Sequence, residues 1–194
     1  MRISSYRRFS LRAALGMGAF SAALLCGGTA FASDGTITIN GTIKATTCAV
    51  TAQLGTTIPT TGSTPNLTVT LPTISWQSIS APNAWSGNTP FSIGVYGCGT
   101  SANTMTVNFD TANTNMSAAG VLTTTGLVGK YMRLLNADQT TAVVPGTPLA
   151  GTPISSGGAG QTFYAQWYNG TGATLTSSNV GNASASLVYT VNYT

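Results

Sequence analysis

The chain has 194 residues, of which 42% are hydrophobic and only 5% are charged, and it contains no histidine. This length can enclose one hydrophobic core, and the apolar content argues against a disordered polar chain. Without histidine, and with only three carboxylates scattered along the sequence, acid–base catalysis has little to work with. We therefore expect a single domain that is not an enzyme and uses no cofactor or metal.

Residues 1–32 have the pattern of an export signal peptide. Four arginines open the segment, an apolar run from Ala13 to Cys26 follows, and Ala30-Phe-Ala32 offers a cleavage site. The apolar run is shorter than the roughly 20 residues that a membrane-spanning helix needs. We expect residues 1–32 to be removed during export.

Loss of the signal peptide changes the charge of the protein. The formal net charge of +4 comes from seven basic and three acidic residues. Four of the bases lie in residues 1–32, so the three that remain balance the three aspartates and the mature chain is neutral. The remaining charged residues are Lys44, Lys130, Arg133, Asp34, Asp110 and Asp138. The basic character of the precursor therefore does not indicate a nucleic-acid or membrane partner.

Two cysteines remain once Cys26 has left with the signal. Cys48 and Cys98 form an even pair in an exported protein, which predicts a disulfide. Two thiols without histidine do not make a zinc site. The disulfide is expected to have a purely structural role.

Residues 35–43, just after the signal, alternate strictly between apolar or glycine positions and polar ones. Such alternation is typical of a half-buried strand. The apolar face consists of Gly35, Ile37, Ile39, Gly41 and Ile43. The segment could be an ordinary edge strand of its own domain. Because it precedes Cys48 with almost nothing upstream of it in the expected mature chain, we favour a strand that is inserted into another molecule.

The C-terminal residues 183–193 alternate in the same way. Their apolar face consists of Ala183, Ala185, Leu187, Tyr189, Val191 and Tyr193. The sequence ends directly after this segment, which predicts a chain that ends inside a sheet and offers an edge to another strand.

Short alternating runs separated by turn residues fill the region between these two segments. We expect strands near Cys48 and at 67–71, 91–96, 105–109, 130–135 and 163–168, and at most one helical turn within 73–89. These strands predict an antiparallel sandwich of the immunoglobulin type. With about six strands in its body, the sandwich would be one short of the seven in a constant-type domain.

Four motifs in order resemble type 1 fimbrial subunits, the pilins of the chaperone–usher family. The motifs are the run from Ser33 to Cys48, Phe91-x-Ile-x-Val-x-x-Cys98, Phe163-x-Ala-x-Trp167 and the penultimate Tyr193. The resemblance covers the whole mature chain.

The resemblance implies an all-β, incomplete immunoglobulin-like β-sandwich that lacks its last strand and is completed by a donor strand from a neighbouring subunit. A periplasmic chaperone would lend a strand first, and an outer-membrane usher would then exchange it for the N-terminal extension of the next pilin. The implied division is a signal peptide at 1–32, a donor-strand extension at 33–44 and a pilin domain at 45–194.

The resemblance also assigns roles to residues. Gly35, Ile37, Ile39, Gly41 and Ile43 would fill five pockets of the neighbour, with Gly41 in a tight pocket and the pocket at Gly35 nearly empty. The terminal strand recognised by the chaperone would present Leu187, Tyr189, Val191 and Tyr193.

The expected function is that of a structural subunit of a surface fimbria, exported through the periplasm, polymerised by donor-strand exchange and supporting cell adhesion. Its partners would be identical or related pilins, the chaperone and the usher, and no nucleic acid. The alternative is a small secreted or tip-located carbohydrate-binding module with an aromatic platform. The candidate platform residues are Trp76, Trp85, Tyr164, Trp167 and Tyr168.

Overall fold

The computed structural model describes residues 32–43, 48–58, 64–100, 102–111, 115–127, 129–178 and 180–194. Within these ranges the chain forms strands and one short 3-10 helix. In chain order the elements are β1 (Ala32–Ile43), β2 (Ala49–Leu54), β3 (Leu67–Ser75), η1 (Trp76–Ile79), β4 (Trp85–Tyr96), β5 (Thr104–Phe109), β6 (Val121–Gly126), β7 (Gly129–Asn136), β8 (Thr152–Pro153), β9 (Ala159–Tyr168) and β10 (Ala183–Tyr193).

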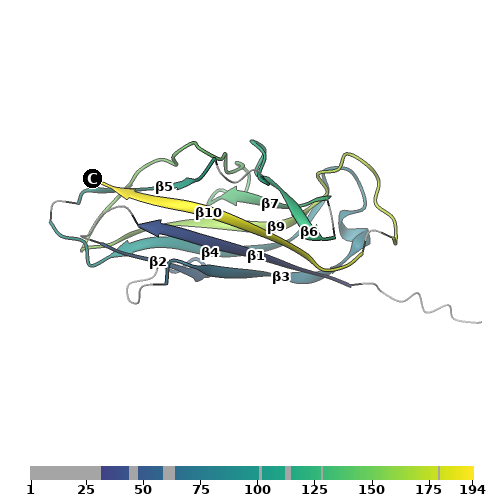
Figure 1. Ribbon diagram of the computed structural model, residues 1–194, viewed down its shortest axis with the longest axis horizontal. Helices are drawn as coiled ribbons and strands as arrows, with labels where there is room; N and C mark the ends of the chain where they lie inside the picture. Colours follow the sequence, from purple (N-terminus) through teal and green to yellow (C-terminus); the bar gives the residue numbers. More distant parts are fainter. Residues whose placement is uncertain are drawn as a thin grey trace, which may run out of the picture.

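The strands form two layers that face each other across one core (Figure 1). One layer has the order β2-β4-β9-β7-β6, and the other contains β3, β1, β10, β5 and β8. The long strand β10 connects them, because Ala183 and Ser184 pair with β6 whereas Tyr189 to Tyr193 pair with β5. The predicted all-β sandwich is confirmed.

Alternating apolar residues of both layers make up the core. The fully buried members from β5 and β9 are Met105, Val107, Phe109, Phe163, Ala165 and Trp167. Phe163 joins the layers: its ring centre lies 5.5 Å from that of Phe91 on the neighbouring strand and 5.2 Å from that of Phe109 in the opposite layer. Edge-to-face and offset contacts of this kind stabilise aromatic cores.

Strand β7 is buried on both faces, whereas alternation predicts only Met132 and Leu134 inward. Leu135, on the outer face, is 2% exposed. The loop after β7 folds back over it: Asn136 N donates to Thr141 O at 2.9 Å, and Leu135 and Ala142 form an isolated bridge. This return of the chain covers an outer face that would otherwise be solvated.

Asp138 holds that returning loop. Its carboxylate accepts hydrogen bonds from the Thr141 hydroxyl and from the backbone N–H groups of Thr140 and Thr141. These bonds favour the charged form and lower the pKa of Asp138 to about 2.

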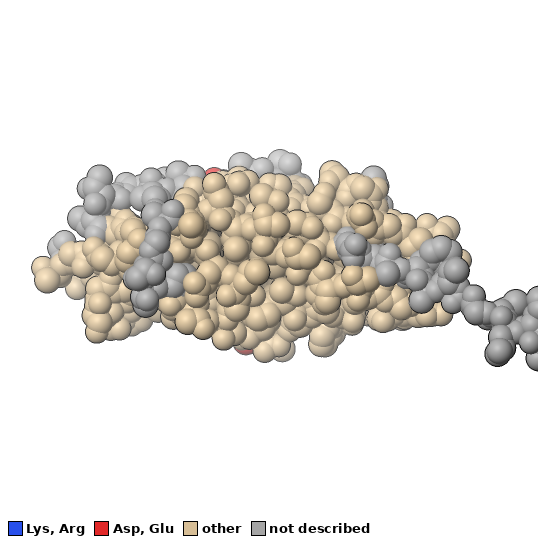
Figure 2. Space-filling model, turned by 90° about the horizontal axis from the view of Figure 1, so that it is seen from below, with Lys and Arg blue, Asp and Glu red and all other residues tan. Residues whose placement is uncertain are grey.

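Little charge is visible on the surface. Figure 2 shows a face that is almost entirely tan, with small red areas at its margin. Among the described residues, no helix has the length and apolar character that crossing a membrane requires.

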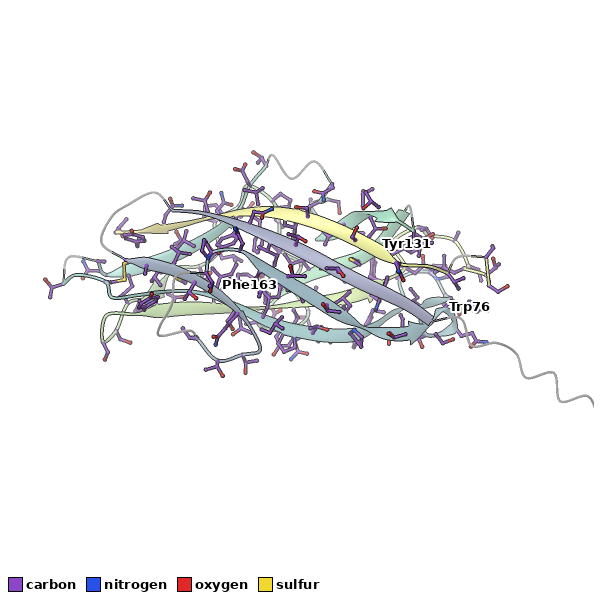
Figure 3. The ribbon with its side chains drawn as sticks, turned by 60° about the horizontal axis from the view of Figure 1, so that its bottom comes forward. Trp76, Tyr131 and Phe163 are labelled. Carbon is purple, nitrogen blue, oxygen red and sulfur yellow. A yellow bond between two sulfur atoms is a disulfide. The ribbon has the colours of Figure 1, made fainter. Side chains whose placement is uncertain are left out.

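The predicted disulfide joins Cys48, just before β2, to Cys98, two residues after β4. These strands are antiparallel neighbours, with Ala49 opposite Tyr96, so the bond lies at one end of the pair. Figure 3 shows it at the end of the sandwich opposite to Trp76. The sequence prediction of this bond is confirmed.

Replacing both cysteines by alanine should lower the free energy of unfolding by about 4 kcal/mol, because the bond closes a loop of 50 residues in the unfolded chain. Urea unfolding of the purified protein measures the change. As a control, a reductant should destabilise the parent protein and leave the double variant unaffected. An unchanged unfolding midpoint would contradict the prediction.

Candidate functional site

The candidate site is the groove between β10 and β3, and in this structure β1 of the same chain occupies it. Residues 35–43 pair in parallel with residues 183–191 of β10. On its other side β1 pairs antiparallel with β3, from Ile39 opposite Leu67 to Ala32 opposite Ser75. Figure 1 shows the arrowheads of β1 and β10 pointing the same way. Within the described residues β10 and β3 are joined only through β1.

The inward face of β1 closes the core. Ile37 and Ile39 are completely buried, in one cluster with Val69 and Leu71 of β3 and Leu187 of β10. The outward residues, such as Thr36 and Thr38, are partly exposed. Removing β1 would expose this apolar floor and two unpaired strand edges at once.

A bulky pair of side chains closes the groove at Gly35. A Cβ atom there would lie 2.6 Å from Cζ2 of Trp167 and 2.8 Å from Cε of Met132. The indole is held in place because Trp167 Nε1 donates to Pro72 O at 2.9 Å. In this arrangement Trp167 and Met132 fill the space at Gly35, and the nearly empty pocket expected in a neighbouring subunit stays a prediction.

Tyr189 closes the groove at Gly41. A Cβ atom at this position would lie 2.5 Å from the phenol oxygen. The hydroxyl donates to Pro65 O at 2.6 Å, and burial raises the pKa of Tyr189 above its usual value. Gly41 N donates to Asn66 Oδ1 at 3.3 Å. The position is tight in this arrangement, while the tight pocket expected for Gly41 in a neighbouring subunit stays a prediction.

The terminal strand β10 forms one wall of the groove. Leu187, Tyr189 and Val191 are fully buried, and Tyr193 is partly buried with its hydroxyl accepting from Cys48 N at 3.4 Å. Beyond β10, Thr194 exchanges backbone hydrogen bonds with Thr104. The predicted terminal strand is thus part of the sheet, while its recognition by a chaperone stays a prediction.

Some predicted positions lie outside the described part of the chain. Residues 1–31 of the expected signal are not described, nor is the side chain of Ile43, although its backbone pairs with Val191. The division at residues 32 and 44 remains a prediction.

The residues of the alternative aromatic platform do not form one surface. Trp167 is completely buried in the core. Trp85 is 59% exposed and lies opposite Tyr168, over whose ring the Arg133 Cζ atom sits at 5.1 Å. Trp76, in η1, is partly buried. What remains of the platform is a small patch around Trp85 and Tyr168.

Sequence reasoning missed the structural role of Asn169. The side chain is fully buried, and its Nδ2 donates to Ala81 O at 2.9 Å and Ala173 O at 2.8 Å. Its Oδ1 accepts from the Thr171 hydroxyl at 2.7 Å. Asn169 thus fastens the loop after β9 to the segment after η1. The signal in the sequence was an Asn-Gly turn directly after a strand.

In the part of the chain that the structure describes, no three cysteine or acidic residues come together as metal ligands. The described interactions of the groove are strand pairing and apolar burial.

Ile39→Ala should destabilise the monomeric protein by about 2–5 kcal/mol, because it leaves a cavity under β1. Thr38→Ala on the outward face is the matched control and should change stability by less than about 0.5 kcal/mol. Chemical denaturation measures both. Equal effects of the two substitutions would show that β1 is not packed as described.

Comparison with known proteins places this chain in a family. Residues 37–194 match the family model described as fimbrial protein. The F17 fimbrial protein of Escherichia coli is 30% identical over 169 residues, which cover 84% of this chain and 88% of that relative. Among solved structures, an antigen and type I fimbria protein of Burkholderia pseudomallei is 22% identical, with a TM-score of 0.41 over 73% of this chain and 88% of its own. The family match and the identity to a fimbrial relative confirm the resemblance seen in the sequence: this chain belongs to the fimbrial protein family.

Proposed function

We propose that this protein is a structural subunit of a surface fimbria that polymerises by donor-strand exchange. In the fibre, residues 33–43 of one copy would occupy the groove between β10 and β3 of the next. The observation that supports this proposal is the groove itself, because its two walls are joined only through β1 within the described residues. A strand of the same sequence from a neighbour carries the same side chains and the same backbone groups.

The energetics favour a stable joint. Ile37 and Ile39 are both completely buried in the groove, and each contributes roughly 1.5–3 kcal/mol. Nine consecutive residues of β1 pair with β10, and each hydrogen bond of such a ladder adds a net 0.5–1.5 kcal/mol or so. Donor and groove are different surfaces of one molecule. Their contact is therefore heterologous and need not close on itself, so it can build an open fibre.

The same features call for assembly partners. A subunit whose groove is empty would expose apolar core and strand edges in the periplasm, where they promote aggregation. A periplasmic chaperone that pairs with β10, through the face formed by Leu187, Tyr189 and Val191, would protect it. An outer-membrane usher would then direct the exchange. In this role the protein supports adhesion as a structural component and catalyses no reaction.

A double substitution, Ile37→Asp with Ile39→Asp, should abolish surface fibres, because it forces two carboxylates into the apolar groove. Thr36→Asp with Thr38→Asp is the matched control on the outward face and should still give fibres. Material sheared from cells is run on a denaturing gel with and without boiling, and the parent protein should give a ladder that collapses only on heating.

Fibres of the inward-facing variant would refute donor-strand exchange at this groove. A parent protein that is recovered from cells only as a monomer, without a ladder, would refute the fimbrial role as well.

The patch around Trp85 supports a second candidate, a carbohydrate-binding surface on the subunit. An exposed indole beside Tyr168 offers flat apolar faces of the kind that stack on sugar rings, and Trp85 is 59% exposed. A glycan array probed with the parent protein and with Trp85→Ala tests it. Binding that Trp85→Ala abolishes would support the candidate, and an array without signal would reject it.

A further inference from the structure

The chain contains the dipeptide Asn-Gly twice, and the two copies lie in very different surroundings. Asn40-Gly41 belongs to β1, whereas Asn169-Gly170 directly follows β9, and a threonine comes next in both cases. Asparagine before glycine readily loses its side-chain amide, because glycine has no Cβ to shield its backbone nitrogen and lets the chain turn freely. The surroundings of each asparagine therefore decide whether it reacts.

The reaction needs a chain that bends at the asparagine. The backbone nitrogen of the glycine forms a bond to Cγ of the asparagine, a five-membered succinimide ring closes, and the side-chain nitrogen leaves as ammonia. Water then opens the ring at either of its two carbonyl groups. One product is aspartate. The other is isoaspartate, in which the main chain passes through Cβ and Cγ and is one carbon atom longer.

Pairing of β1 holds Asn40 in a conformation that does not allow this attack. Residues 35–43 pair with β10, so the backbone is extended and cannot bend without breaking the ladder. Gly41 N, the attacking atom, donates to Asn66 Oδ1 at 3.3 Å. Asn40 Nδ2, the leaving atom, donates to Ser186 Oγ at 3.3 Å. Both reacting groups are thus engaged as long as β1 is paired.

Asn169 is protected by other means. Its side chain is fully buried. Nδ2 donates to Ala81 O and Ala173 O, and Oδ1 accepts from the Thr171 hydroxyl. None of these partners belongs to β1, so release of β1 alone leaves Asn169 enclosed. The two asparagines therefore report two different events, release of β1 and unfolding of the loops of the body.

The isoaspartyl product does not match the groove. Its extra carbon lies within the nine-residue run that pairs with β10, so the residues that follow it move out of register with their partners. Gly41 comes directly after it and has little room to move, because a Cβ atom there would lie 2.5 Å from the phenol oxygen of Tyr189 and 2.9 Å from Pro65 O.

We propose that Asn40 is a spontaneous modification site that limits the time for which β1 can remain outside a groove. While β1 is paired, Asn40 keeps its amide. Once β1 is released, Gly41 N attacks Asn40 Cγ, ammonia leaves, and the isoaspartyl chains that result can no longer be inserted. These chains are lost for closing their own groove and, in the part of the proposal that rests on the proposed function, for joining a neighbour.

The first experiment measures where and when the amide is lost. The purified protein is incubated in mildly alkaline buffer with and without urea, and peptide mass spectrometry follows Asn40 and Asn169 over time. In unfolding urea we expect both to react at similar rates, because their neighbours along the chain are alike. Without urea both should keep their amides.

Variants of the β1 packing then separate the two sites. Ile39→Ala weakens the seating of β1 and should accelerate amide loss at Asn40 by about tenfold or more, with no change at Asn169. Ile39→Val should give a smaller acceleration of the same kind, and it replaces the alanine variant if that variant does not fold. Thr38→Ala on the outward face is the matched control and should leave both rates unchanged. Each rate is divided by the rate of the same variant in urea.

A second experiment tests whether the product still fits. After incubation in urea the denaturant is removed, folded protein is separated from aggregate, and a fragmentation method that distinguishes isoaspartate from aspartate is applied to the peptide with residue 40. Isoaspartate at this position should be depleted from the folded fraction, whereas aspartate should be present in it. Asn40→Gln, which does not close a five-membered ring, should refold in higher yield than the parent protein after the same incubation.

Each failure has its own meaning. Amide loss at Asn40 that is as fast without urea as with it would overturn protection by pairing. Equal acceleration at Asn40 and Asn169 in Ile39→Val would overturn control by release of β1. Isoaspartate at residue 40 in equal proportion in the folded and aggregated fractions would overturn the loss of fit.

Fibres sheared from cells test the extension to a neighbour. Their subunits should carry less isoaspartate at residue 40 than the unassembled subunits of the same cells, and equal proportions would overturn this extension. Cells that form no fibres would refute the proposed function, while the results on the single subunit would still stand.

Discussion

The structure depends on the placement of one strand between two walls that do not reach each other. β1 pairs on one side with β10 and on the other with β3, and its two central isoleucines complete the core. All other elements can be built from the residues after Cys48, but the layer that contains β10 and β3 is continuous only when this strand is present. We therefore expect folding of the body and occupation of the groove to be thermodynamically coupled.

Two aromatic side chains of the body limit the size of the residues that fit in the groove. Trp167 belongs to β9 and Tyr189 to β10, and each occupies the space above a glycine of β1. Both rings are oriented by hydrogen bonds to backbone carbonyls, Pro72 O and Pro65 O. A strand with larger residues at those two positions would have to displace rings that are held by the neighbouring loops. Within this chain, the two glycines of β1 are thus required by the closeness of these rings.

Most of the architecture could be predicted from the sequence because strict alternation signals half-buried strands. The N-terminal strand, the terminal strand, the disulfide and the Phe163 strand all follow from local patterns. β6 could not be found this way, because Val121 and Leu122 are followed by three threonines and the strand has no alternation. The double burial of β7 was also missed, since it depends on a loop that returns over Leu135. Such coverage is a property of the tertiary structure and produces no periodic pattern in the sequence.

The candidate site could likewise be predicted only in part. The inward set of β1 could be listed from its period of two, and the tightness at Gly41 followed from the family resemblance. The side chains that bound the space at Gly35 could not be foreseen, because Trp167 and Met132 are far away in the sequence.

The disulfide has a mechanical consequence in a fibre built by strand exchange. Cys48 is the point at which the chain passes from β1 into the body, and its bond to Cys98 ties that point to the end of β4. β2, the first strand of the body, lies at the edge of its layer and pairs with β4. Without the bond, tension along the chain would separate the edge strand β2 from β4 by breaking their hydrogen bonds one after another. In such a fibre the covalent bond would transfer the load to β4, an interior strand, and the subunit would resist unfolding as a unit.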